Sequence, residues 1–146
     1  MDLSYLFKEY PILPLDLSKP VFNKLLIFLP FNLLNQEDPL ENSWAVTSDS
    51  IAVYIASRLQ VTKVLLVTDV DGIYNNDPKT VSDDKLINDL SASDLLAMNN
   101  RTSVDKALPN LLLKTPIDCY VVNGLFPERI KSILDGQDAI CTLIKS

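Results

Sequence analysis

The chain has 146 residues, of which 47% are hydrophobic, a size that predicts one compact domain over residues 1–146. Its formal net charge of −6 and the lack of any cluster of basic and aromatic residues argue against binding to nucleic acid. The absence of histidine and of any CxxC pair excludes a Cys/His zinc site, and no set of protein metal ligands is predicted.

Nothing in the sequence predicts contact with a membrane. The first residues lack the basic and apolar regions of a signal peptide. Prolines and polar residues interrupt the most apolar stretch, residues 20–34, which is shorter than the roughly 20 residues that span a bilayer. Cys119 and Cys141 are expected to be reduced and structural. We therefore expect a cytoplasmic protein.

The first third of the chain mixes prolines with apolar runs. Residues 1–20 are rich in proline and are predicted to form a connecting segment. The apolar run Leu25–Leu29 predicts a strand buried on both faces, and residues 35–42 predict a polar loop. A helix is then predicted from a cap at Ser48 to about Leu59.

The middle of the chain alternates strand and helix signals. Lys63–Thr68 predicts a strand that ends in a sharp polar turn, and residues 75–84 predict an exposed loop. Ser91 or Ser93 is expected to cap a short helix that ends near residue 98. Residues 106–114 predict a second helical segment, which Pro109 should break.

The last third repeats this alternation. Strands are predicted over Ile117–Val122 and Ala139–Ile144, on either side of a helix that starts with Pro127 and ends at Gly136. The alternation predicts an α/β fold, a three-layer αβα sandwich with a mostly parallel sheet.

The turn after the second predicted strand can carry chemistry, because ligands of open α/β sheets gather at the carboxyl ends of strands. Thr68, Asp69 and Asp71 place a hydroxyl and two carboxylates on this turn, where they can hold a ribose or a hydrated Mg²⁺. Gly72 would let a ligand or another backbone segment approach closely. The alternative is an ordinary turn with solvated aspartates.

A second polar group lies at the predicted helix start, Thr47–Ser50. Its hydroxyls and the amides of the helix N-terminus can offer an anion site. Asp49 would then organise a lysine or a metal among phosphates. The alternative is that Ser48 or Asp49 is simply a helix cap.

These two groups, in this order and spacing, resemble the amino-acid kinase superfamily, which includes carbamate, acetylglutamate, aspartate, uridylate and isopentenyl phosphate kinases. The resemblance covers the chain from about Asn42 to its end, and more loosely the preceding strand. It is closest to the [5-(aminomethyl)furan-3-yl]methyl phosphate kinases of methanofuran biosynthesis. The segments that carry it are Ser43–Ala52, Val67–Tyr74, Asp77–Pro78, Thr102–Asp105, Tyr120–Gly124 and Pro127–Arg129.

The resemblance implies an ATP- and Mg²⁺-dependent phosphotransferase that acts on a small phosphorylated alcohol. It assigns Asp49 the catalytic role of organising phosphate-binding lysines, and it places Thr47 and Ser48 in the acceptor pocket. Such a transfer relies on positioning and charge neutralisation, so the lack of histidine is no objection. The residues expected to bind the nucleotide are Thr68, Asp69, Asp71, Gly72, Tyr74 and Asp77.

Two departures from the family pattern concern its phosphate-binding loops and lysine. The family begins with a lysine-bearing strand and two glycine-rich loops, but the only glycines here are Gly72, Gly124 and Gly136. The chain is therefore expected to start within the family's domain, and to form a homo-oligomer or associate with a missing N-terminal part. No lysine stands at the family's usual place after Thr102; the nearest are Lys106 and Lys114, whose ordinary role would be that of solvated helix lysines.

Three functions stay open on the sequence. The first is a kinase or one piece of it. The second is a nucleotide-binding remnant or subunit that needs a partner chain for transfer, and the third is an α/β domain without a ligand.

Overall fold

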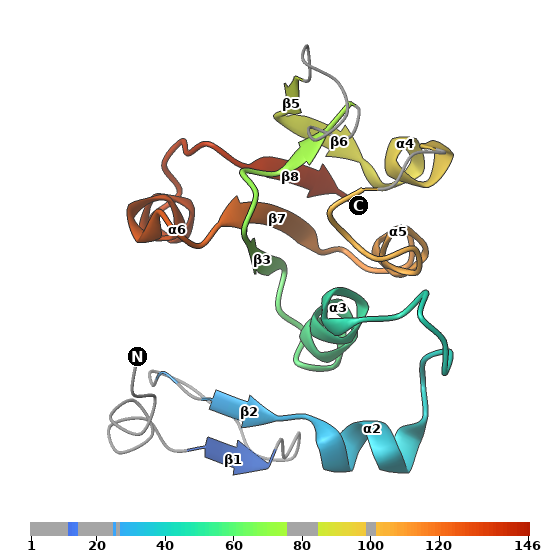
Figure 1. The fold of residues 1–146 in the computed structure, drawn as a ribbon. Helices are drawn as coiled ribbons and strands as arrows, with labels where there is room; N and C mark the ends of the chain where they lie inside the picture. The colour runs from blue at the N-terminus through green and yellow to red at the C-terminus, as the bar shows by residue number, and fades with distance from the viewer. Residues whose placement is uncertain (1–11, 15–24, 26, 76–84, 99–101) are drawn as a thin grey trace. The chain divides into compact units, whose positions relative to one another are not determined.

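The structure is a computed structural model that describes residues 12–14, 25, 27–75, 85–98 and 102–146 (Figure 1). The chain divides into two compact units, Met1–Glu41 and Asn42–Ser146. A single kinase-like domain over the whole chain stays a prediction. The described part contains no helix that is both long and apolar enough to cross a membrane.

The first unit contains one short parallel strand pair and one helix among its described residues. β1 (Ile12–Pro14) pairs in parallel with β2 (Ile27–Leu29), and α2 (Phe31–Glu37) follows at once. The helix ends at Asp38, which takes a left-handed conformation and donates its N–H to the Leu34 carbonyl at 2.9 Å. Of the predicted connecting segment, only β1 lies within the described residues.

Two predictions for the first unit were wrong. The polar loop predicted over residues 35–42 starts later, because its first residues complete α2; leucine, glutamine and glutamate favour helix, and Pro30 suits a helix start. The strand predicted over Leu25–Leu29 is shorter and is not buried on both faces, since Leu25 is 66% and Leu29 54% exposed.

The second unit is built around a four-stranded sheet in the order β3-β7-β8-β6. β3 (Lys63–Thr68) has the predicted bounds and pairs in parallel with β7 (Asp118–Asn123). β8 (Thr142–Lys145) is antiparallel to β7 and parallel to β6 (Asp89–Ser91). The largely parallel sheet was predicted correctly, although the last strand starts at Thr142 rather than Ala139.

Helices cover both faces of this sheet, as Figure 1 shows. On one face, α3 (Ser48–Arg58), α4 (Ala92–Ala97) and α5 (Leu108–Leu112) bury the main core. On the other, α6 (Pro127–Leu134) packs against β7, and the ammonium of Lys63 in β3 donates to its Ile133 carbonyl at 3.0 Å. The three-layer arrangement is therefore confirmed. The sheet side chains in the main core are Val64, Leu66, Cys119, Val121 and Ile144.

Prolines and glycines set several of the helix ends. Pro127 lies in the first turn of α6, and Gly136, with φ +72°, follows its end, as predicted. Ser91 caps α4 by accepting a hydrogen bond from the Asp94 N–H at 3.0 Å. The predicted break at Pro109 was wrong, because this residue stands in the first turn of α5, where its missing N–H costs nothing.

Three short strands of the second unit were not predicted: β6, which is described above, and the two strands β4 and β5. β4 (Ile73–Tyr74) and β5 (Leu86–Ile87) form an antiparallel ribbon on either side of residues 76–84, which lie outside the described residues. Both cysteines are free, Cys119 buried and Cys141 partly buried. Burial raises the pKa of the Cys119 thiol to about 12, which keeps it protonated and supports a structural role.

Candidate active site

The two predicted groups of site residues lie at one edge of the sheet. Thr68 ends β3 beside Asn123, which ends β7 in the parallel register. The helix α3 immediately precedes β3 and returns along the sheet, so its N-terminus lies at the same carboxyl edge. The edge therefore combines a polar turn with a helix start.

A single segment, residues 102–105, bonds to both groups. The Ser103 hydroxyl donates to the Gly72 carbonyl at 3.2 Å, and the Asp105 N–H donates to Asp49 Oδ2 at 3.1 Å. The segment thus connects the turn after β3 to the start of α3. The sequence marked this segment as part of a family resemblance but assigned it no role.

Asp105 occupies the anion position at the start of α3. Its Oδ2 accepts the backbone N–H groups of Thr47 at 2.8 Å and Ser50 at 3.0 Å, together with the Thr47 hydroxyl at 3.1 Å. Its Oδ1 accepts the buried Ser50 hydroxyl at 2.5 Å and the N–H groups of Ala107 at 3.1 Å and Leu108 at 2.9 Å. One carboxylate therefore satisfies the amides at the starts of both α3 and α5.

This arrangement corrects the predicted anion site at residues 47–50. The helix amides of Thr47 and Ser50 already have a carboxylate partner, so they are not available to a phosphate. The residue at the N-cap is Thr47, whose hydroxyl accepts from the Asp49 N–H at 3.5 Å, rather than Ser48, which is exposed. The reason is a long-range contact that local capping rules do not include.

The two carboxylates have opposite pKa shifts. Burial raises the pKa of Asp49, and the nearby negative charge of Asp105 raises it further. The hydrogen bonds that Asp49 accepts lower this pKa, but they do not cancel the increase. Burial also acts to raise the pKa of Asp105, but the hydrogen bonds from Ser50, Thr47 and Leu108 outweigh it and hold this pKa below its ordinary range. Asp105 is therefore a firmly ionised anchor, whereas Asp49 is the more readily protonated of the pair.

The turn after β3 is held by its own hydrogen bonds. The Thr68 hydroxyl accepts from the Val70 N–H and donates to the Val70 carbonyl, both at 3.1 Å. Asp71 Oδ1 accepts from Asn123 at 3.0 Å and from Arg129 at 2.7 Å. Burial opposes ionisation of Asp71, but the bonds from Arg129 and Asn123 prevail and lower its pKa.

The exposed carboxylate on this turn is Asp69. The close approach that Gly72 permits is made by β8, because a Cβ at Gly72 would lie 2.3 Å from Thr142 Oγ1 and 2.9 Å from its backbone nitrogen. The buried Thr142 hydroxyl also accepts the Ile73 N–H at 2.8 Å. Of the other two predicted nucleotide contacts, Tyr74 lies half-buried in β4, and Asp77 lies outside the described residues.

A pocket of about 900 Å³ opens beside the start of α3. Two predicted residues, Thr47 and Asp49, line it, and Lys106 lines it together with Thr102 and Ser103. Its apolar side includes Trp44, Leu95, Leu96, Met98, Val104 and Pro109. The pocket therefore combines carboxylate, hydroxyl and ammonium groups with an apolar wall.

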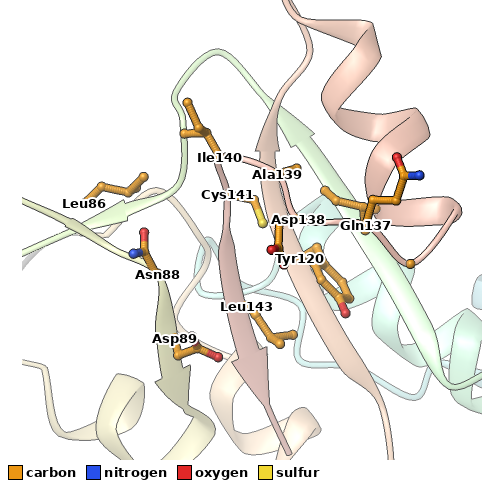
Figure 2. Close-up of a pocket in the computed structure, with 12 residues that line it drawn as sticks. Leu86, Asn88, Asp89, Tyr120, Gln137, Asp138, Ala139, Ile140, Cys141 and Leu143 are labelled. Atoms are coloured by element: carbon orange, nitrogen blue, oxygen red, sulfur yellow. The ribbon is translucent and has the colours of Figure 1, made fainter.

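A second hollow, of about 720 Å³, lies on the α6 side of the sheet (Figure 2). Its lining includes Tyr120 and Leu143, which are opposite each other on β7 and β8, and the segment 136–141. None of the predicted site residues line it. The pocket beside α3 is therefore the better candidate for the active site.

Sequence comparison identifies the family to which this arrangement belongs. The model for the Amino acid kinase family matches residues 17–123. The chain belongs to the amino acid kinase family. The predicted membership is thereby confirmed, and the match includes both predicted site groups from Thr47 to Asp77 as well as the Ser103–Asp105 segment.

One curated protein and two solved structures illustrate what this chain is similar to. The [5-(aminomethyl)furan-3-yl]methyl phosphate kinase of Methanocaldococcus jannaschii is 41% identical over 98% of this chain, which spans 62% of that protein's length. A UMP kinase structure from Bacillus anthracis aligns with a TM-score of 0.62 and 26% identity, covering 68% of this chain and 41% of the other. An isopentenyl phosphate kinase structure aligns with a TM-score of 0.51 and 27% identity, covering 68% of this chain and 39% of the other. The predicted likeness to the aminomethylfuran subgroup is therefore confirmed.

Two residues of the site were not found by sequence reasoning. Asp105 carried one local signal, since an aspartate three residues before Leu108 suits a helix cap, but its bonds to α3 cross 55 sequence positions to Ser50. Arg129 was noted only as part of a family motif. Its partner Asp71 is 58 positions away, and no periodicity predicts that pair.

Proposed function

We propose that this chain is an ATP-dependent small-molecule kinase, or the nucleotide-binding part of one, that transfers a phosphoryl group to a phosphorylated alcohol. The observation that carries the proposal is the bonding of residues 102–105 to both the turn after β3 and the start of α3. This bonding holds a nucleotide-type turn and an acceptor-type helix start in one fixed arrangement. Fixed positioning is the main contribution that a protein makes to phosphoryl transfer.

The acceptor we propose is [5-(aminomethyl)furan-3-yl]methyl phosphate or a close analogue. The proposal is supported by the 41% identity to the Methanocaldococcus jannaschii kinase of that name. It also fits the pocket beside α3, which joins polar groups to an apolar wall, as a charged phosphate on a small ring requires.

Binding of Mg²⁺ would come mainly from the nucleotide. The described residues contain no group of three or more Asp, Glu, Cys or His side chains that could hold a metal ion. Mg²⁺ in kinases commonly takes one or two carboxylates and completes its shell with phosphates and water. Asp49 at the pocket and the exposed Asp69 fit that limited role, with the metal supplying charge neutralisation when bound.

The residue roles follow the same division. Asp49 would organise the groups that bind the transferred phosphoryl, while Thr47, which lines the pocket, and Ser48, which does not, would contact the acceptor. Asp71 and Gly72 would act mainly by shaping the turn, since their contacts are with Arg129 and Thr142. The residues proposed to form the nucleotide side of the site, either by direct contact or by shaping the turn, are Thr68, Asp69, Asp71, Gly72, Tyr74 and Asp77.

The experiment combines two measurements on the purified chain. Calorimetric titration with Mg·ATP measures nucleotide binding, and an ADP-release assay with the aminomethylfuran phosphate measures transfer. Asp49→Asn should abolish transfer and leave nucleotide affinity nearly unchanged, whereas Tyr74→Ala should weaken nucleotide binding itself. Equal effects of both variants on binding would contradict this division of roles.

The alternative function is a nucleotide-binding subunit that needs a partner chain for transfer. It is favoured by the sequence, which holds only three glycines and so offers no glycine-rich phosphate loop. It predicts saturable binding of Mg·ATP without ADP release.

We propose a cytoplasmic location for the protein. We also propose either self-association or association with a chain that supplies the phosphate loops. Sedimentation with and without nucleotide would test the self-association.

A further inference from the structure

The pocket beside α3 has an unbalanced charge. Two carboxylates, Asp49 and Asp105, line it, and both would repel a phosphate. Of the described residues that line the pocket, Lys106 alone carries a positive charge. A phosphorylated ligand placed here therefore needs the Lys106 ammonium, because two carboxylates without a cation would make its binding unfavourable.

The backbone beside Lys106 is fixed. Asp105 is buried, its carboxylate accepts hydrogen bonds from the starts of α3 and α5, and its N–H bonds to Asp49. Lys106 is the next residue, so its Cα has little freedom relative to Asp49. Its side chain is exposed and, within the described part of the chain, forms no ion pair. The backbone of Lys106 is therefore held in place, while its ammonium is available to bind a ligand.

Lys114 provides the contrast. It is also an exposed lysine, it lies just past the end of α5, and it does not line the pocket. From the sequence alone, the two lysines had equal standing as phosphate ligands. The structure distinguishes them, because only Lys106 shares a cavity with Asp49 and Thr47.

The apolar residues that line the same pocket indicate what else the ligand carries. Trp44 is 98% exposed and Leu96 46% exposed, and both line the pocket with Met98. Exposed aromatic and aliphatic side chains at the mouth of a polar pocket favour a ligand with a small apolar or aromatic body. The pocket thus suits a phosphate monoester of a ring-bearing alcohol.

We propose that Lys106 binds the phosphate of the acceptor and determines the specificity for phosphorylated over unphosphorylated alcohols. The inference rests on the proposed function and assigns Lys106 to its acceptor side. The lysine contributes charge neutralisation and positioning, with no covalent step.

The test compares Lys106→Met with Lys114→Met as the matched control, and with Lys106→Arg as the charge-conserving variant. Calorimetry without ATP measures binding of [5-(aminomethyl)furan-3-yl]methyl phosphate and of its unphosphorylated alcohol. Lys106→Met should weaken phosphate-ester binding about tenfold to a hundredfold, the range expected for a lost charged hydrogen bond. It should leave alcohol binding unchanged, while Lys114→Met changes neither.

Two further readouts separate this role from a structural one. Binding to wild-type protein should weaken as salt rises, and Lys106→Met should remove most of that dependence, whereas Lys106→Arg should retain it. If transfer occurs, the KM for the acceptor should rise with little change in the KM for ATP.

The outcomes also separate this inference from the proposed function. Ester binding that depends on Lys106 but without ADP release would uphold the inference and contradict autonomous kinase activity. ADP release with the same acceptor KM in Lys106→Met and wild type would uphold the function and overturn the inference. Equal losses in the Lys106 and Lys114 variants would also overturn it, since a general charge effect would then explain the result.

Discussion

The backbone N–H of Asp105 donates to Asp49 Oδ2 at 3.1 Å, while the carboxylate of Asp105 accepts from the backbone N–H groups of Thr47 and Ser50. The two aspartates are therefore held in place by the same contact region. Because the partners of Asp105 include Thr47, Ser50 and Leu108, the start of α3 and the start of α5 depend on one side chain.

The first prediction concerns this anchor. Asp105→Ala should lower the free energy of unfolding by about 1–4 kcal/mol, because two helix starts lose their cap and each cap is worth about 0.5–2 kcal/mol. Urea unfolding followed by circular dichroism measures the loss. The matched control, Asp94→Ala, removes an exposed first-turn carboxylate of α4 and should cost less than about 1 kcal/mol.

The pH dependence of this anchor follows from its lowered pKa. A carboxylate with a lowered folded pKa stabilises the fold above its ordinary pKa, near 3.8, and loses that contribution as pH falls through the folded value. The gap in unfolding free energy between wild type and Asp105→Asn should therefore be widest at neutral pH and shrink in acid. A gap that is constant from pH 7 to pH 2 would contradict an ionised Asp105.

The second prediction has the opposite sign. Asp49 has a raised pKa, so its stabilising contribution is present below about pH 3.8 and is lost as pH rises through the folded value. Asp49→Asn should therefore unfold at higher urea concentration than wild type at pH 7. The gain should stay under about 1 kcal/mol, because the side chain is only partly buried. A less stable variant at pH 7 would show that the hydrogen bond from Asp105 requires the charge.

The third prediction tests whether Asp71 shapes the turn or binds the nucleotide. Arg129→Met removes the guanidinium that lies 2.7 Å from Asp71. Because the Arg129 and Asp71 side chains are 15% and 31% exposed, the free energy of unfolding should fall by about 1 kcal/mol. The pKa of Asp71 should rise, which carboxyl NMR titration measures. If Asp71 acts structurally, Asp71→Asn should destabilise the chain and change ATP affinity less than about threefold. A larger loss of affinity with unchanged stability would favour direct nucleotide binding.

The fourth prediction compares two glycines. A Cβ at Gly72 would overlap Thr142, with 2.3 Å to its hydroxyl oxygen, so Gly72→Ala should cost about 1–3 kcal/mol from overpacking alone. At Gly136 nothing lies within 4 Å, but its φ of +72° disfavours other residues. Gly136→Ala should therefore cost about 1–2 kcal/mol of backbone strain. Thermal or urea unfolding of both variants measures the difference, and a tolerated Gly72→Ala would contradict the close approach of β8.

The parts of the fold that were predictable rest on local chemistry. The β-branched and leucine run Lys63–Thr68 matches β3 at both ends, and the Pro127 and Gly136 signals mark the ends of α6. Helix α2 was missed because its amphipathic pattern is only two turns long. The ribbon of β4 and β5 was missed because two-residue strands are too short to show alternation.

The sequence predicted which elements carry the candidate site residues, but it did not predict the contacts of those residues. Thr68 was expected at the end of a strand and Asp49 in the first turn of a helix, and β3 and α3 place them there. The partner of each carboxylate comes from a segment more than fifty positions away, as in the pair Asp71 with Arg129. Such pairs follow from tertiary packing, which local sequence patterns do not show. For this reason the sequence predicted that a bound ligand would supply the anion at the start of α3, whereas the anion there is the carboxylate of Asp105.

The central claim, that this edge of the sheet binds a nucleotide and an acceptor for phosphoryl transfer, is tested most directly by one titration. Mg·ATP is titrated into the purified chain by calorimetry, and ADP release is then measured on addition of [5-(aminomethyl)furan-3-yl]methyl phosphate. The account predicts saturable one-site binding and ADP release that disappears in Asp49→Asn. The absence of any saturable nucleotide binding would contradict it.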